Sequence, residues 1–372
     1  MKLRLLVFVA AALAACGSAQ AAPRVDARAW FVQNAATGEV LVSRAADRRL
    51  PIASITKLMT VLVVLDHARP DDLVTVGPDA SSVGESTVHL VPGEQLTVRD
   101  LIEAALIQSA NDAANALADH VGEGDRARFV ELMNAKARAL GLRDTQFVRP
   151  DGLDVEGHYS TARDVTLLAR VAMRSPLVRE IVARRTGTIA GARSLYTWND
   201  LLGRFPGLIG VKTGHTSSAG WCEVAAARGR GLTVYATVLG SGTRAGRNDD
   251  LAELLSWGIS RYRVVSLVQA GRVYARAEAP YGRAALSLVA AGPVVRVVRV
   301  GRPLVERVVA PAAVDLPVRR GQRLGSVRVY DRGRLVASRP LVAARAIERP
   351  SLGGRIAWYA ERTLDHLTGF FT

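Results

Sequence analysis

Alternating and periodic apolar positions predict an antiparallel sheet with packed helices in the first two thirds of the chain. Apolar and polar residues alternate on both sides of the turn signal Ala35-Ala36-Thr37-Gly38, which is typical of a β-hairpin. Farther on, apolar residues recur at helical spacing, and Thr97 and Asp100 have capping-box spacing. Strand pairs before and after a helical block indicate an α+β fold. The expected strands are 30–34, 39–42, 187–190, 210–214, 221–226 and 232–239; the expected helices are one opening within 51–60, then 97–108 running into 109–112, 113–120, 125–140, one capped by 158–164 and running to about 173, and 247–259.

Beyond about residue 262 the pattern changes to short valine-rich strands separated by Gly and Pro. Tyr330-Asp331-Arg332-Gly333-Arg334-Leu335 has the pattern of a tight hairpin. We therefore expect a small β-rich domain over 262–345 that follows a larger domain over 22–261.

The last segment, 346–372, is expected to be a linker and an amphipathic helix. At 100° per residue the polar side chains of 355–371 gather opposite an apolar arc of about 140°, although Trp358 falls on the polar side. The length and the polar face fit a helix lying on the outer face of the cytoplasmic membrane. The alternative is that the helix packs on its own domain. The arc comprises Ile356, Tyr359, Ala360, Leu364, Leu367, Phe370 and Phe371.

The first 21 residues have the features of a secretory signal peptide. A basic start, Met1-Lys2-Leu3-Arg4, precedes an apolar stretch over 5–15 and the small-residue site Ala19-Gln20-Ala21. We expect an exported, periplasmic protein cleaved after Ala21. The alternative is lipid attachment at Cys16, because Leu13-Ala14-Ala15-Cys16 resembles a lipoprotein processing site. Cleavage leaves Cys222 as the single cysteine, so the exported chain has no internal disulfide, and Cys222 is expected to be a packed thiol.

Charge does not indicate a nucleic-acid-binding protein, although the net charge is +15 and the pI is about 10.7. Residues 263–372 hold 19 Arg, no Lys and 7 acids, so this third carries +12 of the total. Its arginines alternate with valines, as in the run 294–300, and do not cluster with aromatic residues. This pattern is typical of the solvated side of strands, with attraction to an anionic surface as a secondary possibility.

Lysine is rare, and one lysine lies three residues after a serine. Only Lys2, Lys57, Lys136 and Lys212 occur among 49 basic residues. On a helix Ser54 and Lys57 lie about 60° apart around the axis, so the amine reaches the hydroxyl. Arginine stays charged and cannot act as a base, whereas a buried lysine beside another cation can. The alternative for Ser-x-x-Lys alone is a helix cap followed by a surface charge.

Two further motifs follow in chain order and favour acyl transfer by a nucleophilic serine. Ser54 would attack a carbonyl carbon with Lys57 as the base. In Ser109-Ala110-Asn111, Ser109 would relay a proton to the leaving group and Asn111 would hold the substrate amide and the Lys57 amine. In Lys212-Thr213-Gly214, the first two side chains would bind a substrate carboxylate, and Gly214 would let the substrate backbone lie along the strand edge.

These motifs resemble those of the penicillin-recognising serine acyl enzymes, and within them the D-alanyl-D-alanine carboxypeptidases among the low-molecular-mass penicillin-binding proteins. The resemblance implies a β-lactamase/transpeptidase-like domain of antiparallel sheet and helical subdomain, followed by the β-rich domain and the terminal helix. Departures are Ala110, where Gly is frequent, and Trp198-Asn199-Asp200, where Asn-x-Asn and a basic residue are expected. The likeness extends over residues 106–115, 157–164 and 206–216.

The resemblance implies removal of the terminal D-alanine from peptidoglycan pentapeptide stems, and acylation by β-lactams at the same serine. It also implies an oxyanion hole formed by the backbone N–H groups of Ser54 and His215. No cofactor is expected, and no metal, because His67, His89 and His120 are too scattered for a metal site.

Three other functions stay open at this point. A β-lactamase needs a deacylating base, usually a glutamate followed four residues later by asparagine, whereas Glu131 and Asn134 have the wrong spacing. A DD-endopeptidase that cuts cross-links usually lacks the β-rich domain and the terminal helix. A non-catalytic wall-binding scaffold would not need every motif side chain.

Overall fold

The computed structural model describes residues 5–10 and 21–368. The described residues divide into two compact units, 21–261 and 262–368, with residues 5–10 grouped with the second unit. Cys16, Phe370 and Phe371, on which predictions were made, lie outside the described residues.

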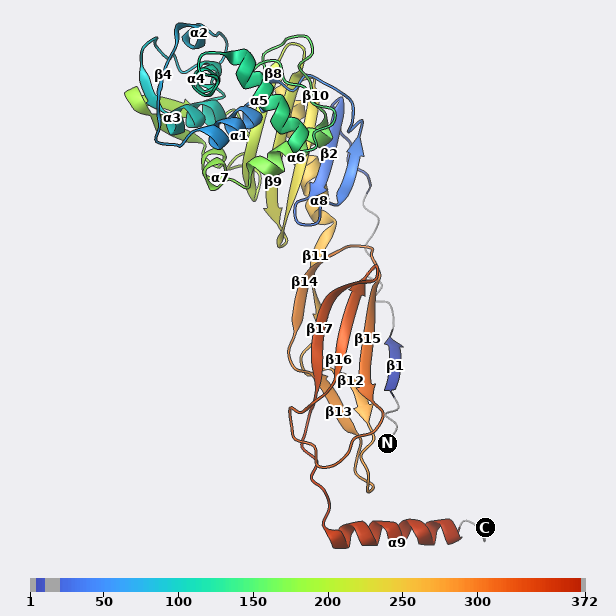
Figure 1. Cartoon of the computed structure of the whole chain (residues 1–372). Coiled ribbons are helices and arrows are strands. Elements are labelled where there is room, and N and C mark those ends of the chain that lie inside the picture. Colours follow the sequence, from blue (N-terminus) through green and yellow to red (C-terminus); the bar gives the residue numbers. More distant parts are fainter. Residues whose placement is uncertain (1–4, 11–20, 369–372) are drawn as a thin grey trace. The chain divides into compact units, whose positions relative to one another are not determined.

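The first unit is built on a five-stranded antiparallel sheet with the order β3-β2-β10-β9-β8 (Figure 1). Neighbouring residues on a strand point to opposite faces, and the two faces are covered by different helices. On β10, Thr237 Oγ1 contacts Thr166 of α6 at 2.6 Å, whereas Val234 lies against Gly258 of α8. The sheet is therefore enclosed between α6 and α8. The bounds are β2 Ala29–Asn34, β3 Val40–Arg44, β8 Leu208–Thr216, β9 Gly220–Gly229, β10 Leu232–Ser241, α6 Ala162–Ala172 and α8 Arg244–Ser260.

A helical block lies between β3 and β8 in the sequence. Its centre is α1, whose residues 57–64 are all buried. The predicted capping box at Thr97 and Asp100 is confirmed at the start of α3. The elements are the 3₁₀ turn η1 Ala53–Thr56, α1 Lys57–His67, α2 Pro78–Ser81, α3 Val98–Glu103, the π-helical turn η2 Ala104–Gln108, α4 Asn111–Gly122, α5 Arg126–Ala139, α7 Pro176–Val182 and the 3₁₀ turn η3 Ala190–Ala192, with hairpins β4 Leu73–Thr75/β5 Gln95–Thr97 and β6 Thr186–Ile189/β7 Arg193–Tyr196.

The second unit is β-rich. A six-stranded sheet has the order β1-β15-β16-β17-β13-β12, and β11 pairs with β14 beside it. Its core is made largely of Val, Leu and Ala side chains, which fits the valine-rich pattern of the sequence. The bounds are β1 Leu5–Ala10, β11 Tyr262–Val268, β12 Val273–Ala277, β13 Leu286–Ala290, β14 Val294–Arg299, β15 Leu304–Pro311, β16 Arg323–Asp331 and β17 Arg334–Ala343. The α+β fold class is confirmed.

The chain continues into helix α9, Leu352–Thr368. Trp358, which falls on the polar side of the helical wheel, packs against Tyr281 of the β-rich unit with ring centroids 5.6 Å apart. The side chains of Leu352, Ile356, Tyr359 and Leu364 are 58–68% exposed. Across the described residues, no helix combines the length and the apolar character that a membrane crossing needs.

Candidate active site

Ser54 lies in η1, the turn that leads into α1, at a point where two backbone segments touch. Ala53 has a φ of +49°, and Gly152 passes close to its carbonyl. A Cβ on Gly152 would be 2.1 Å from the Ala53 oxygen, so only glycine allows this approach. The loop at 151–153 is thereby held against the start of the serine helix.

The Lys57 amine is completely buried and has three oxygen partners. Its Nζ lies 2.8 Å from Ser54 Oγ, 2.7 Å from Asn111 Oδ1 and 2.8 Å from the Asp151 carbonyl oxygen. Burial lowers the pKa of Lys57 to about 8, against the opposing charge of Asp151, and the Arg149 cation adds to the decrease. The uncharged amine needed by a general base is therefore available near neutral pH.

A break between two helices presents Ser109 and Asn111 to Lys57 and Lys212. Sequence periodicity predicted one helix running into these residues, and that prediction is wrong. The π-helical turn η2 is followed by Ser109 in the left-handed conformation, with φ 64° and ψ 29°. The break leaves Ser109 Oγ 2.8 Å from Lys212 Nζ, while Asn111 begins α4. A continuous helix would turn these side chains successively by 100° and away from one site.

Strand β8 carries the third motif along the edge of the site. Its alternation places Lys212 and Thr213 on opposite faces, with Lys212 toward the helical block. Burial and the charge of Lys57 hold the pKa of Lys212 well below its usual value. A Cβ on Gly214 would be 2.9 Å from the Ile52 oxygen and 3.0 Å from the Ser54 nitrogen. Gly214 thus lets β8 lie directly against the backbone N–H of Ser54.

His215 follows on the same strand and is exposed. Its imidazole stacks on Trp221 with ring centroids 4.0 Å apart. In the described part of the chain, its imidazole makes no hydrogen bond with Ser54 or Lys57, which fits a contribution through the backbone.

These side chains meet around a cavity of about 240 Å³. Six of the eight predicted site residues line it, whereas the two amines, those of Lys57 and Lys212, lie buried behind it. Its lining includes Ser54, Ser109, Asn111, Thr213, His215, Gly214, Trp198 and Arg247.

Asp151 and Asn115 support the site and were not predicted from the sequence. Asp151 is fully buried. Asn115 Nδ2 donates to Asp151 Oδ2 at 2.7 Å and to the backbone carbonyl oxygen of Asn111 at 2.8 Å. Arg149 pairs with the same carboxylate. The four-residue spacing of Asn111 and Asn115 was the available signal, because it places both amides on one face of a helix.

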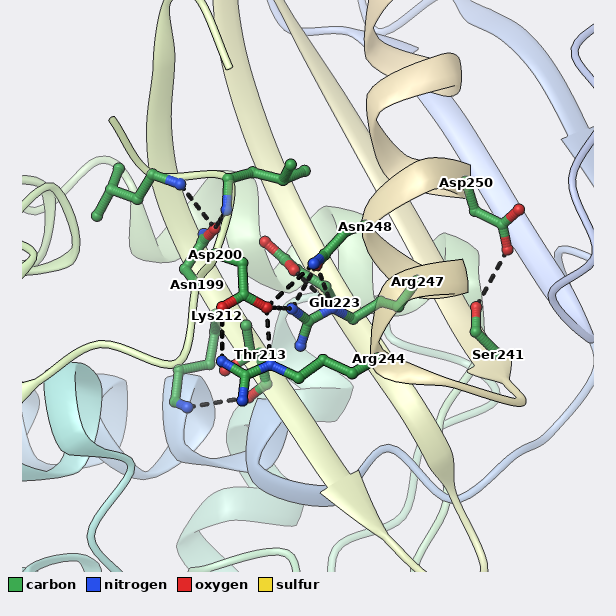
Figure 2. A network of polar contacts seen from close by, with 12 residues as sticks. Asn199, Asp200, Lys212, Thr213, Glu223, Ser241, Arg244, Arg247, Asn248 and Asp250 are labelled. Carbon is green, nitrogen blue, oxygen red and sulfur yellow. Dashed lines mark hydrogen bonds and ion pairs between the residues drawn. The ribbon is translucent and has the colours of Figure 1, made fainter. Parts of the chain in front are cut away.

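A charged network around Arg247 was also missed. The Arg247 side chain is 1% exposed and lies between Glu223 and Asp200, at 3.1 Å from each carboxylate (Figure 2). Arg244 makes two hydrogen bonds to Asp200 and lies over the Trp198 ring at 5.2 Å. The departure at Trp198-Asn199-Asp200 is thus accompanied by two arginines from α8. Their spacing in the sequence carried no signal because their partners are 24 to 47 residues away.

His158 and Cys222 have structural roles. His158 Nε2 lies 2.8 Å from Thr56 Oγ1, and burial lowers its pKa to about 4, so the ring is neutral. Cys222 is a buried free thiol whose pKa is raised by burial to about 11, which fits the predicted packed thiol. Within residues 5–10 and 21–368, no cluster of His, Cys, Asp and Glu has the composition of a metal site.

Comparisons with known proteins agree with this geometry. Residues 17–243 match the family model of peptidase family S11, D-alanyl-D-alanine carboxypeptidase. The D-alanyl-D-alanine carboxypeptidase DacC of Escherichia coli strain K12 is 32% identical over 373 residues, covering 95% of this chain and 92% of the relative. DacF of Bacillus subtilis strain 168 is 30% identical over 351 residues, covering 90% and 88%.

Solved structures give the same result. Penicillin binding protein 5 from Haemophilus influenzae aligns with a TM-score of 0.65 and 27% identity over 89% of this chain and 100% of that chain. The Streptomyces K15 DD-transpeptidase aligns with a TM-score of 0.62 and 34% identity over 65% of this chain and 100% of that chain.

Proposed function

The chain belongs to the D-alanyl-D-alanine carboxypeptidase family of serine peptidases, and we propose that it releases the terminal D-alanine of peptidoglycan stem peptides through an acyl-enzyme on Ser54. The observation that carries this proposal is the buried Lys57 amine at 2.8 Å from the Ser54 hydroxyl, with its pKa lowered to about 8.

Acylation begins with proton transfer from Ser54 Oγ to Lys57 Nζ. The oxygen attacks the carbonyl carbon of the penultimate residue, and the oxyanion is stabilised by the N–H groups of Ser54 and His215. Ser109 Oγ then passes a proton to the nitrogen of the departing D-alanine. The proton that Lys57 took from Ser54 replaces it, with Lys212 Nζ 2.8 Å from Ser109 Oγ. In deacylation, Lys57 takes a proton from the attacking water, and the serine hydroxyl is restored.

The other end of the cavity binds the carboxylate of the terminal D-alanine. Thr213 offers a hydroxyl there, and Lys212 and Arg247 offer cations. Arginine remains protonated in proteins, so Arg247 is the permanent positive charge of this end. A β-lactam, which also has a carboxylate and a reactive carbonyl, fits the same arrangement.

Exposure to benzylpenicillin tests the nucleophile. We expect one covalent adduct per chain, mapped by mass spectrometry to the peptide that contains Ser54. Ser54→Ala should give no adduct, whereas Ser86→Ala, which replaces another hydroxyl lining the cavity, should still be acylated. An adduct on any other residue would contradict the proposal.

The glutamate considered for the β-lactamase alternative does not lie at the site. Glu131 lies on α5 and is absent from the lining of the cavity. Slow single acylation of the protein by a chromogenic cephalosporin fits the carboxypeptidase, and sustained turnover would favour the alternative.

Release of free D-alanine from pentapeptide stems, compared with cleavage of cross-linked muropeptides, separates the carboxypeptidase from an endopeptidase.

We also propose that residues 1–21 direct export to the periplasm and that α9 holds the enzyme on the outer face of the cytoplasmic membrane. Supporting this, Leu352, Ile356, Tyr359 and Leu364 place four exposed large apolar side chains on one short helix. Burying such side chains in the membrane interface is favourable by roughly 25 cal/mol for each Å² of apolar surface removed from water.

A chain ending at Pro350 is expected to move from the membrane fraction to the soluble periplasmic fraction. Its carboxypeptidase activity should be unchanged, because the catalytic unit ends at residue 261. In the full chain, Ile356→Asp with Leu364→Asp should release the protein, whereas Glu361→Ala on the polar side should not. Retention of the shortened chain after a salt wash would reject this anchor and favour lipid at Cys16.

A further inference from the structure

A buried carboxylate lies behind the cavity, at the end assigned to the substrate carboxylate. Glu223 on β9 is 0% exposed, and its Oε2 is 3.1 Å from Nε of Arg247, which is 1% exposed (Figure 2). Glu223 lies directly opposite Thr213 in the antiparallel pairing of β9 with β8. The Glu223 carboxylate therefore contacts Arg247, the permanent cation that lines this end of the cavity, and Glu223 is the cross-strand neighbour of Thr213.

Glu223 is poorly satisfied for a buried anion. Neither of its oxygens accepts a hydrogen bond from the described residues. An ionised carboxylate in such a place is costly unless it is paired and hydrogen-bonded. Burial raises the pKa of Glu223 to about 7; Arg247 and Lys212 oppose the increase, and Asp200 adds to it.

Arg247 itself is fixed in place independently of Glu223. Its Nη2 lies 2.6 Å from Asn248 Oδ1 and 3.1 Å from Asp200 Oδ2. Asp200 is shared with Arg244, which holds it from the exposed side. Protonation of Glu223 thus changes the charge around Arg247 while the guanidinium keeps two other partners.

We propose that Glu223 tunes substrate affinity: the cavity binds the terminal carboxylate more tightly when Glu223 carries a proton than when it is ionised. This inference rests on the proposed function, in which Lys212, Thr213 and Arg247 receive that carboxylate.

The direction follows from the charges that face Glu223. Arg247 of α8 contacts it, and the charges of Lys212 on β8 and of Asp200, which lies in the loop before β8 and pairs with Arg244, also act on it. An ionised Glu223 cancels part of the positive field of Lys212 and Arg247, whereas a neutral Glu223 leaves that field to the substrate. By linkage, binding of the carboxylate draws a proton onto Glu223.

The test is the pH dependence of KM and kcat between pH 5.5 and 8.5, with a blocked L-Lys-D-Ala-D-Ala peptide as substrate. KM of the parent enzyme is expected to rise about five- to tenfold from pH 6 to pH 8. Glu223→Gln, which is neutral at every pH, should keep the low KM throughout, with kcat close to the parent value. Glu223→Asp should restore the rise.

Two further measurements separate the explanations. His215 also lines the cavity, so His215→Gln should retain the KM rise if Glu223 is responsible. Calorimetry of the same peptide binding to Ser54→Ala at pH 7.5, in buffers of different ionisation enthalpy, should show net proton uptake that Glu223→Gln abolishes. This second readout does not depend on the turnover of a weakened variant.

Parallel KM profiles of the parent and Glu223→Gln, or binding without proton uptake, would overturn the proposal for Glu223. A different result tests the underlying assignment: if Arg247→Ala leaves KM unchanged, the carboxylate does not bind at this end. If Arg247→Ala raises KM but Glu223→Gln does not alter the pH profile, the proposed function stands and the inference about Glu223 is wrong.

Discussion

Replacing Lys57 with methionine is expected to slow acylation of Ser54 about a thousandfold or more, at the upper part of the range for loss of a general base. Methionine has a similar length and no charge, so it fills the buried site without leaving an unpaired cation. The two remaining oxygen partners, Asn111 Oδ1 and the Asp151 carbonyl, lose a donor but keep their positions in α4 and the adjoining loop. The measurement is the rate of penicillin adduct formation by stopped-flow fluorescence or timed mass spectrometry.

The chain offers a matched control. Lys136, on α5, is the one lysine that lies between Lys57 and Lys212 in the sequence. It pairs with Asp66 near the surface. Lys136→Met should leave the acylation rate within about twofold of the parent, because surface ion pairs contribute little. Acylation of Lys57→Met at the parental rate would show that the serine is activated by another group.

The same role of Lys57 predicts how the acylation rate of the parent enzyme depends on pH. Only the unprotonated amine can accept the Ser54 proton, and the pKa of Lys57 is lowered to about 8. The acylation rate should therefore fall about tenfold per pH unit below 8 and level off above it. The residual rate of Lys57→Met should lack this limb, whereas a persisting limb would assign the ionisation to a different side chain.

The sequence predicted the contact within one helical turn and the positions of the longer strands along the chain. Ser54 and Lys57 were placed on one helical face, and their side chains lie 2.8 Å apart. The capping box at Thr97, the helix at α5 and the strands on both sides of β9 follow from local periodicity. Such patterns are readable because burial repeats at 3.6 or 2 residues.

Short and irregular elements escaped prediction. Helix α7, the hairpin β4/β5 and strand β7 are too short to show a period, whereas β6 was expected at 187–190. The π-helical turn before Ser109 also has no periodic signal, because its extra residue per turn is visible only as a small shift of phase. This irregularity decides the site, since it brings Ser109 to Lys212 across 103 residues of sequence.

The buried charges of the site escaped for another reason. Asp151 and Arg247 resemble ordinary surface residues in the sequence, because their neighbours vary in polarity, whereas Glu223 stands in the apolar run 221–226 that names no partner for it. The pairing of Glu223 with Arg247 depends on β9 and α8 packing together, and Asn115 reaches Asp151 only when α4 packs against the 151–153 loop. A buried polar residue is recognised by its partners, and those partners are distant in sequence.

Gly152→Ala is expected to have the largest effect on stability, because the added Cβ would overlap the backbone that carries Ser54. The Cβ would lie 2.1 Å from the Ala53 oxygen and 2.7 Å from Thr56 Oγ1, and φ at Gly152 is +85°. The left-handed conformation costs alanine roughly 1–2 kcal/mol, and the overlap adds strain of about 1–3 kcal/mol. We expect the free energy of unfolding of the catalytic unit to fall by about 3–4 kcal/mol in total.

Gly141→Ala separates the two contributions. Gly141 has a φ of +75°, and a Cβ there would meet nothing within 4 Å, so this variant should show the conformational cost alone. Calorimetric unfolding should place the midpoint about 3 °C below the parent for Gly141→Ala and about 10 °C below it for Gly152→Ala. The second variant should also acylate more slowly, since the Asp151 carbonyl that holds Lys57 precedes Gly152 directly. Equal midpoints for the two variants would mean that the 151–153 loop moves away at little cost, and that the serine helix does not depend on it.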